Sequence, residues 1–148
     1  MRPKRPWFAL LIALVPGLVW AAGEVAVSTD QLIYDGGDIT VVVVNNTRSP
    51  IMFPGCGAAY LERFTGEGFE AMQVPECEGE PPPVALKRGE ERRIVLTPNV
   101  ETREILRPVA TFATGCKSGV PLPQAECRNF ESARARYVSW GPQPAAQP

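Results

Sequence analysis

The sequence predicts an all-β protein, folded as an antiparallel β-sandwich of about seven to nine short strands. Three observations lead to this prediction. Short segments with alternating or β-branched apolar residues recur over residues 24–140, and Gly-, Pro- and Asn-containing turns separate them about every 8–12 residues. Helical periodicity is scarce. The length of 148 residues is sufficient for one domain, and no internal repeat divides it.

Nine segments carry the strand pattern, and turn-forming residues set their limits. In chain order, the predicted strands are 24–28, 39–45, 51–53, 59–64, 69–74, 84–86, 92–97, 104–114 and 133–140.

The first two strands flank a glycine turn. Residues 24–28 alternate, and Gly36-Gly37 precedes the strongest strand, 39–45, which ends at an Asn-Asn-Thr sequence. Ile39, Val41 and Val43 share one face of this strand, but the opposite face is also apolar. The sequence therefore leaves open which face lies in the core.

The middle of the chain predicts a hairpin and a loop. Residues 51–53 form a brief strand that ends at Pro54-Gly55, and strands 59–64 and 69–74 flank the four-residue turn Thr-Gly-Glu-Gly. The acidic, proline-rich stretch 75–83 cannot join a strand ladder, so we expect a surface loop there.

The C-terminal strands follow a second Gly-containing turn, at residues 87–90. In strand 92–97, Ile94 and Leu96 are the expected core residues. Strand 104–114 contains Pro108, which lacks an N–H group and predicts a sheet edge or a bulge at that point. Residues 133–140 are the last expected strand.

The N-terminal 23 residues predict a cleaved signal peptide. Arg2, Lys4 and Arg5 precede an uncharged apolar run that Pro16-Gly17 interrupts, and small residues lie at the expected cleavage site between Ala22 and Glu24. A membrane anchor is the alternative, but this run of 17 residues is shorter than the ~20 that a spanning helix needs. Cleavage would remove three basic groups and leave a net charge of 12 − 16 = −4.

Domain boundaries follow from these segments. We expect a signal peptide at 1–23, the β-sandwich at 24–140 and a disordered Pro-rich tail at 141–148. A periplasmic or secreted location is the consequence, with no membrane span after cleavage.

Two motifs resemble those of bacterial exported immunoglobulin-like domains. The stretch TDQLIYDGGDITVVVVNN is similar to the opening of such domains, and LKRGEERRIVL is similar to their Leu-x-x-Gly-Glu turn and strand. The matching residues of the first motif are Thr29, Asp30, Tyr34, Gly37, Asp38 and Asn45. The resemblance, which extends to the intracellular-proteinase-inhibitor fold, implies an immunoglobulin-like sandwich over residues 24–140. It implies no particular activity, and residues 104–108 depart from the Gly-x-Tyr-Arg pattern of the family.

The four cysteines, Cys56, Cys77, Cys116 and Cys127, predict two disulfides, because an even number in an oxidising compartment favours pairing. Three connectivities are open. Cys56 and Cys77 lie symmetrically about the hairpin turn, and the other two about residues 119–124, which favours Cys56–Cys77 and Cys116–Cys127. Structural zinc sites use more closely spaced cysteines, and no Cys-x-x-Cys motif is present.

The absence of histidine excludes Ser-His and Cys-His nucleophiles and histidine metal sites. No serine lies in a Gly-x-Ser-x-Gly or Ser-x-x-Lys motif, so we expect no enzyme activity, no catalytic residue and no cofactor. A net charge of −1 disfavours nucleic-acid binding.

Three further residue groups allow a functional and a structural interpretation. Asp30, Asp35 and Asp38 could supply oxygens to calcium, but turn formation is the preferred role, so no metal site is predicted. Asn45-Asn46-Thr47 matches a glycosylation acceptor, and a strand-ending turn is preferred. A charged docking surface or a solvated face could form from Glu76, Glu78, Glu80, Lys87, Arg88, Arg92 and Arg93.

Three functions remain open at this stage. The preferred one is a non-catalytic protein-binding or accessory module of the bacterial cell envelope, monomeric by itself, with an unidentified protein partner. The second is a secreted protease inhibitor that acts through residues 117–126, a proline-bearing loop closed by the predicted Cys116–Cys127 disulfide, or through the acidic, proline-rich loop 75–83. The third is a purely structural envelope protein.

Overall fold

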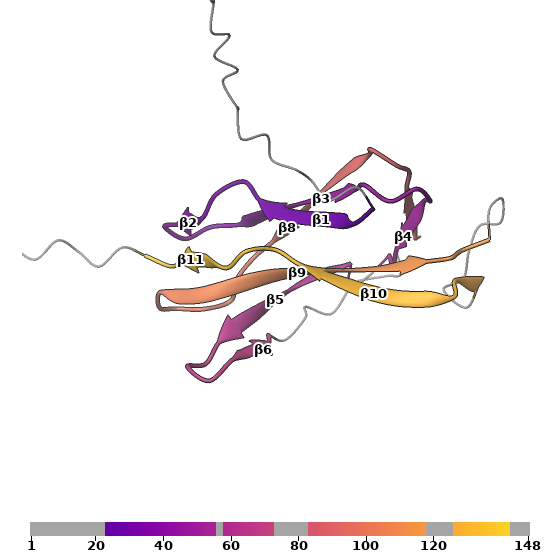
Figure 1. Ribbon diagram of the computed structural model, residues 1–148. Coiled ribbons are helices and arrows are strands. Elements are labelled where there is room, and N and C mark those ends of the chain that lie inside the picture. Colours follow the sequence, from indigo (N-terminus) through magenta and orange to yellow (C-terminus); the bar gives the residue numbers. More distant parts are fainter. Residues whose placement is uncertain (1–22, 56–57, 73–82, 118–125, 143–148) are drawn as a thin grey trace, which may run out of the picture.

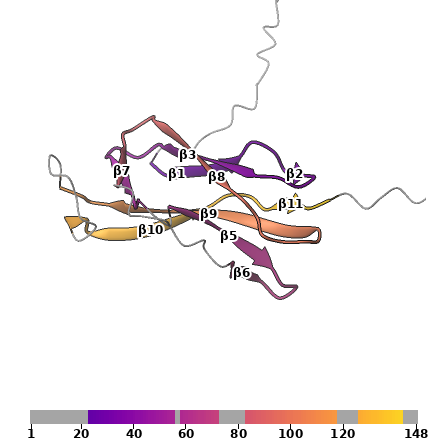
Figure 2. The same cartoon turned by 180° about the vertical axis from the view of Figure 1, so that it is seen from behind.

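Two β-sheets packed face to face form the protein (Figure 1, Figure 2). The computed structural model describes residues 23–55, 58–72, 83–117 and 126–142. The predicted all-β sandwich is confirmed. The predicted signal peptide and tail lie almost wholly outside the described residues and stay predictions.

Eleven strands make up the described part of the chain. They are β1 (Val25–Thr29), β2 (Ile33–Tyr34), β3 (Ile39–Asn45), β4 (Ile51–Phe53), β5 (Ala59–Phe64), β6 (Phe69–Ala71), β7 (Val84–Leu86), β8 (Glu91–Leu96), β9 (Glu104–Thr114), β10 (Asn129–Arg134) and β11 (Val138–Trp140). The count exceeds the expected seven to nine because β2 was not predicted and because the last predicted strand is two strands, β10 and β11.

The smaller sheet has the order β1-β3-β8, with β3 antiparallel to both neighbours. Ile39, Val41 and Val43 are fully buried, and the residues between them are partly exposed. The face of β3 that carries Ile39, Val41 and Val43 is therefore the one that packs into the core, a choice that the sequence left open. Ile94 and Leu96 of β8 pack against the core, as predicted.

The larger sheet is arranged around β9, its longest strand at 11 residues. On one side β9 pairs with β10 and then β11, and on the other with β5 and, at Met52, β4. The predicted hairpin is present as β5 and β6, which pair antiparallel from Glu62–Ala71 to Phe64–Phe69. At the far edge, β2 pairs with β11 in parallel, the exception in an otherwise antiparallel sandwich.

Pro108 explains why β10 and β11 are separate strands. Between the pairs Val109–Arg134 and Leu106–Val138, β9 has two residues and the opposite chain has three, 135–137, which is a β-bulge. The Ala135 N–H donates to the Pro108 carbonyl at 2.9 Å. The N–H and C=O of a strand residue point to the same side of the strand. The N–H group that Pro108 lacks would therefore have pointed toward the bulge, where no partner is required. The predicted bulge is confirmed, and it lies inside the sheet, not at an edge.

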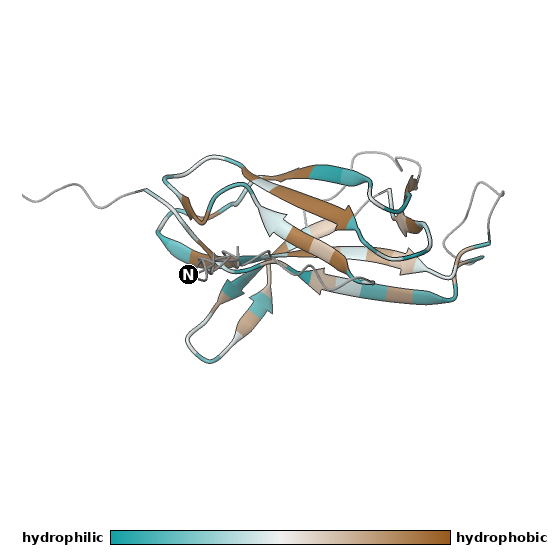
Figure 3. Cartoon of the chain, turned by 45° about the horizontal axis from the view of Figure 1, so that its top comes forward, coloured by the Kyte–Doolittle hydropathy of each residue, from teal (hydrophilic) through white to brown (hydrophobic). Residues whose placement is uncertain are grey.

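The core fills the space between the two sheets. Phe53, Leu106, Val138 and the inward residues of β3 are its most deeply buried members. Figure 3 shows hydrophobic and hydrophilic residues alternating along several strands, as expected where one face of a sheet packs inward. None of the described segments forms a long apolar helix that could cross a membrane.

The parallel β2–β11 pair is held at its end by the residues around Gly141. The Trp140 indole N–H donates to the Gly37 carbonyl at 2.8 Å, and the Arg103 side chain donates to Ser139 Oγ and the Gly141 carbonyl. Gly141 has φ +133°, and a Cβ there would lie 2.5 Å from the Arg103 Cα. Only glycine fits this close approach of two backbones.

Asn45 links the two sheets from the end of β3. Its side-chain amide donates to the carbonyls of Leu86 in β7 and Ser49, both at 2.9 Å. Its Oδ1 accepts from the N–H and the hydroxyl of Thr47 at 2.9 and 2.6 Å. Both N–H groups and the oxygen of this buried amide are therefore hydrogen-bonded inside the protein. This geometry supports the strand-ending turn over a glycosylation site.

Replacing Asn45 tests how much this link contributes. Asn45→Ala would leave the buried Leu86 carbonyl without its donor, so we expect a loss of about 1–3 kcal/mol in the free energy of unfolding. Urea unfolding followed by Trp140 fluorescence measures it. Asn46→Ala is the matched control and should stay within about 0.5 kcal/mol of wild type. An equal effect of the two substitutions would contradict the proposed link.

Candidate functional site

The three aspartates of the first motif have separate partners. Asp30 accepts a short hydrogen bond from the Tyr34 hydroxyl, Asp35 pairs with Arg103 at 3.4 Å, and the Thr97 hydroxyl donates to Asp38 at 2.8 Å. Among the described residues, no three of His, Cys, Asp or Glu lie close enough to hold a metal ion. These aspartates therefore brace the β2 region, as the turn interpretation predicts.

Tyr34 anchors the turn between β1 and β2. Burial, together with the hydrogen bond to Asp30, raises the pKa of Tyr34 to about 12. The Gln31 N–H donates to the same phenol oxygen. A phenol that donates and accepts in this way stays neutral and holds the turn, so Tyr34 is a structural residue.

The disulfide predicted between Cys116 and Cys127 is present, with an S–S distance of 2.07 Å. It joins the end of β9 to the segment before β10. Residues 118–125 of the candidate inhibitory loop lie outside the described residues. Cys56 and Cys77 also lie outside them, so their pairing stays a prediction.

The predicted charged docking surface is described only in its basic part, since Glu76, Glu78 and Glu80 lie outside the described residues. Lys87, Arg88 and Arg93 are exposed, and Arg93 pairs with the neighbouring Glu91 at 2.9 Å. Arg92 points inward, with its guanidinium 6.0 Å from the centre of the Phe53 ring. These basic residues thus do not form one continuous patch.

A different surface, the outer face of the larger sheet, brings exposed apolar side chains together. It is the face opposite the core residues Leu61, Leu106 and Ala110. One row of it crosses β6, β5, β9, β11 and β2, and we call this the apolar row: Phe69, Phe64, Ile105, Ser139 and Ile33.

Strand register places these residues side by side. Phe64 pairs with Phe69, and Ser139 pairs with both Ile105 and Ile33. The antiparallel ladder between β5 and β9 ends at the pair Arg63–Leu106, and the next position of that ladder places Phe64 beside Ile105. The row thus runs from one edge of the sheet to the other, and Ser139, whose hydroxyl accepts a hydrogen bond from Arg103, is a polar member between Ile105 and Ile33.

Three side chains of the apolar row are open to solvent, and Phe69 and Ser139 are half-buried. Ile33 is 61% exposed, Phe64 43% and Ile105 42%. The Phe64 and Phe69 rings lie 5.3 Å apart in a tilted arrangement. Single exposed apolar residues are ordinary, but a row of them on neighbouring strands is typical of an interaction surface.

Next to the apolar row lies the Glu62 cluster, formed by Glu62 of β5, Arg107 of β9 and Arg134 of β10. Glu62 is only 5% exposed. Arg107 donates to its Oε2 from Nε at 2.7 Å, and Arg134 reaches both carboxylate oxygens at 3.3 and 3.4 Å. The guanidinium of Arg107 lies 3.9 Å from the centre of the Phe69 ring, a cation–π contact that joins the cluster to the apolar row.

The charge state of Glu62 is fixed by these arginines. Burial alone would raise the pKa of the carboxyl, but the hydrogen bonds and positive charges of Arg107 and Arg134 outweigh it and lower the pKa below its ordinary value. Glu62 is therefore ionised at neutral pH and acts as an anchor for two cations, not as a proton donor.

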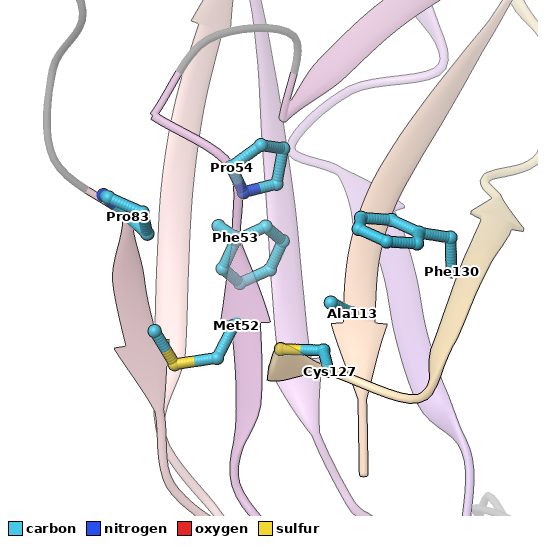
Figure 4. Close-up of a pocket in the computed structure, with 7 residues that line it drawn as sticks. All are labelled: Met52, Phe53, Pro54, Pro83, Ala113, Cys127 and Phe130. Carbon is cyan, nitrogen blue, oxygen red and sulfur yellow. The ribbon is translucent and has the colours of Figure 1, made fainter. Parts of the chain in front are cut away.

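A small apolar pocket lies at the opposite end of the larger sheet, beside the disulfide (Figure 4). It is lined by Met52, Phe53, Pro54, Pro83, Ala113, Cys127 and Phe130. Its described lining is apolar, and the Cys127 sulfur is in the disulfide with Cys116.

Comparison with protein-family models, curated proteins and solved structures finds no match for this chain.

The sequence did not reveal the Glu62 cluster, because Glu62 and Arg134 are 72 positions apart in the chain. The sequence does indicate that Tyr60, Glu62 and Phe64 share one face of β5, because residues alternate along a strand and Leu61 lies on the other face. Only the strand register shows that Arg107 and Arg134 reach the same carboxylate.

The lowered pKa of Glu62 predicts an acid-dependent contribution to stability. Because its pKa is lower in the folded state, the contribution is complete above the unfolded pKa, about 4.3, and is lost as the pH falls through the folded pKa. Glu62→Gln should therefore cost about 1–3 kcal/mol at pH 7, and the difference from wild type should shrink at lower pH. Urea unfolding between pH 7 and about pH 2 measures this.

Glu67→Gln, in the exposed turn of the same hairpin, is the control and should change stability by less than about 0.5 kcal/mol at pH 7. A Glu62→Gln difference that stays constant over the whole pH range would contradict the assigned ion pairs.

Proposed function

We propose that this protein is an exported, non-catalytic, immunoglobulin-like module of the bacterial cell envelope that binds another protein through the outer face of its larger sheet. The observation that carries the proposal is the apolar row, which exposes Ile33, Ile105 and Phe64 together on one face. Leaving such side chains in water is costly, and a protein partner would bury them.

The course of the first strands supports an immunoglobulin-like domain. β1 pairs with β3 of the smaller sheet, and the chain then crosses so that β2 joins β11 of the larger sheet in parallel. A first strand shared between two sheets suits a sandwich of this type. The residues that carry the resemblance in sequence also have structural roles, since Asp30 and Tyr34 brace this crossing and Asn45 links the sheets.

The chemistry of the binding face favours association over catalysis. Its carboxylate, Glu62, is buried and shared by two arginines, so it is poorly placed to accept or donate a proton. A rigid charged group beside exposed aromatic residues suits recognition.

A binding experiment tests the proposal. The mature protein, tagged at its C-terminus, is used to capture partners from a bacterial envelope extract, alongside the variants Ile105→Asp and Ile33→Asp. We expect wild type to capture a reproducible partner and both variants to lose it, since a charge replaces a buried apolar contact.

Val95→Asp is the matched control, because Val95 is 59% exposed but lies on the smaller sheet. It should retain the partner. Capture of no reproducible partner would favour a purely structural protein, and equal loss with the control would show that the apolar row is not the binding surface.

Protease inhibition stays a second candidate, favoured by the Cys116–Cys127 disulfide that closes the 117–126 segment. Closure reduces the entropy lost when a loop binds. If this segment inhibits a protease, a panel of secreted proteases should contain one that wild type inhibits and that a Cys116→Ala/Cys127→Ala variant inhibits more weakly. The absence of inhibition across the panel would remove this candidate.

A further inference from the structure

We infer that the partner is a protein segment that places a carboxylate beside an apolar side chain, with the carboxylate bound by Arg134 and the apolar group on Ile105 and Phe64. This inference rests on the proposed function and names the chemistry of the partner.

The net charge of the outer face points to an acidic group. Strand register places three charged residues on this face, Glu62, Arg107 and Arg134, for a local sum of 2 − 1 = +1. The whole chain is acidic in balance, with a net charge of −1. The exposed apolar surface therefore lies next to a local excess of positive charge, although the protein as a whole has no excess of positive charge.

The two arginines are bound unequally, and the difference identifies Arg134 as the group available to a ligand. Arg107 contacts Glu62 closely, stacks on Phe69 and is 27% exposed. Arg134 approaches Glu62 only at 3.3–3.4 Å and is 47% exposed. Its Nη1 makes no hydrogen bond to the described residues, so part of its guanidinium fork remains open to a second carboxylate.

Glu62 prepares this site without occupying it. Its carboxylate is buried and holds both guanidinium groups on the outer face, which reduces the freedom that Arg134 would lose on binding. One negative charge cannot neutralise two arginines, so attraction for an external anion remains.

The spacing of the two features suggests an extended partner segment. Arg134 pairs with Val109, which lies four residues from Ile105 on the same face of β9, or about 13 Å along the strand. Its guanidinium reaches back to Glu62, whose partner in β9 is Arg107, two residues or about 7 Å from Ile105. An extended peptide lying along the strands repeats at the same distance. It would place its acidic residue and an apolar residue two or four positions apart.

Peptide selection on the wild-type protein tests the inference. A random-peptide display library is selected on immobilised wild type, and the affinities of the enriched peptides are then measured for wild type, Arg134→Gln, Arg134→Lys and Arg93→Gln. We expect enrichment of Asp or Glu two or four residues from Phe, Leu or Ile. Arg134→Gln should weaken binding about tenfold, and Arg134→Lys should weaken it less.

Arg93→Gln is the matched control, because Arg93 is an exposed arginine of the smaller sheet in an ion pair with Glu91. It should bind like wild type. Should Arg134→Gln fail to fold, replacing the acidic residue of the peptide by Asn or Gln gives the same test on wild type, again with an expected loss of about tenfold.

Several results would overturn the inference. These are enrichment of peptides without an acidic residue, equal binding of the neutral peptides, and no enrichment at all. Two controls identify other occupants of this face: sedimentation with phosphatidylglycerol vesicles that depends on Arg134 would indicate a lipid surface, and a concentration-dependent dimer abolished by Ile105→Asp would indicate a second copy of the chain. Either result would replace the proposed segment.

The envelope capture experiment separates this inference from the proposed function. A partner that Ile105→Asp loses but that Arg134→Gln retains at full level would leave the function intact and refute the carboxylate. Loss of the partner from neither variant would refute the function itself.

Discussion

The arrangement of the larger sheet depends on β9 and on the proline within it. β9 pairs with four other strands, and Pro108 faces the bulge that divides the last part of the chain into β10 and β11. The bulge adds one residue between Arg134 and Val138, so the register of β10 on β9 differs by one residue from that of β11 on β9. As a result, Arg134 reaches Glu62 while Ser139 lies beside Ile105 and Ile33. One missing N–H group thus separates a charged part of the face from an apolar part.

The two sheets are held together by apolar burial and by a small number of saturated polar links. Asn45 connects β3 to β7, and the Trp140 indole connects β11 to the Gly37 turn. A buried amide is stabilising only when its donors and acceptors are all paired, as those of Asn45 are. These links lie at the ends of the sandwich, so they fix the relative placement of the sheets and leave the outer face of the larger sheet to other contacts.

The sequence predicts most strands because their signals are local. Strand 39–45 follows a glycine turn, the Thr65–Gly68 turn defines a hairpin, and the strand around Pro108 begins and ends where predicted. The two-residue strand β2 is too short to show a period, and it forms only because β11 lies beside it. The division between β10 and β11 likewise follows from a partner strand. Local signals do not predict the Glu62 cluster, since Glu62, Arg107 and Arg134 meet only through the pairing of three strands.

Glu62 links the stability of this protein to its surface chemistry. A buried ion pair contributes little net stability when its desolvation is counted, and an apolar replacement of the whole group is often no less stable. The cluster is therefore poorly explained as a stabilising device alone. Its other effect is positional, because it holds two guanidinium groups on an exposed face next to Phe64 and Ile105, and one of them is only loosely satisfied. Under the proposed function, this surface would receive a carboxylate and an apolar group together, which is a more specific demand than apolar contact alone.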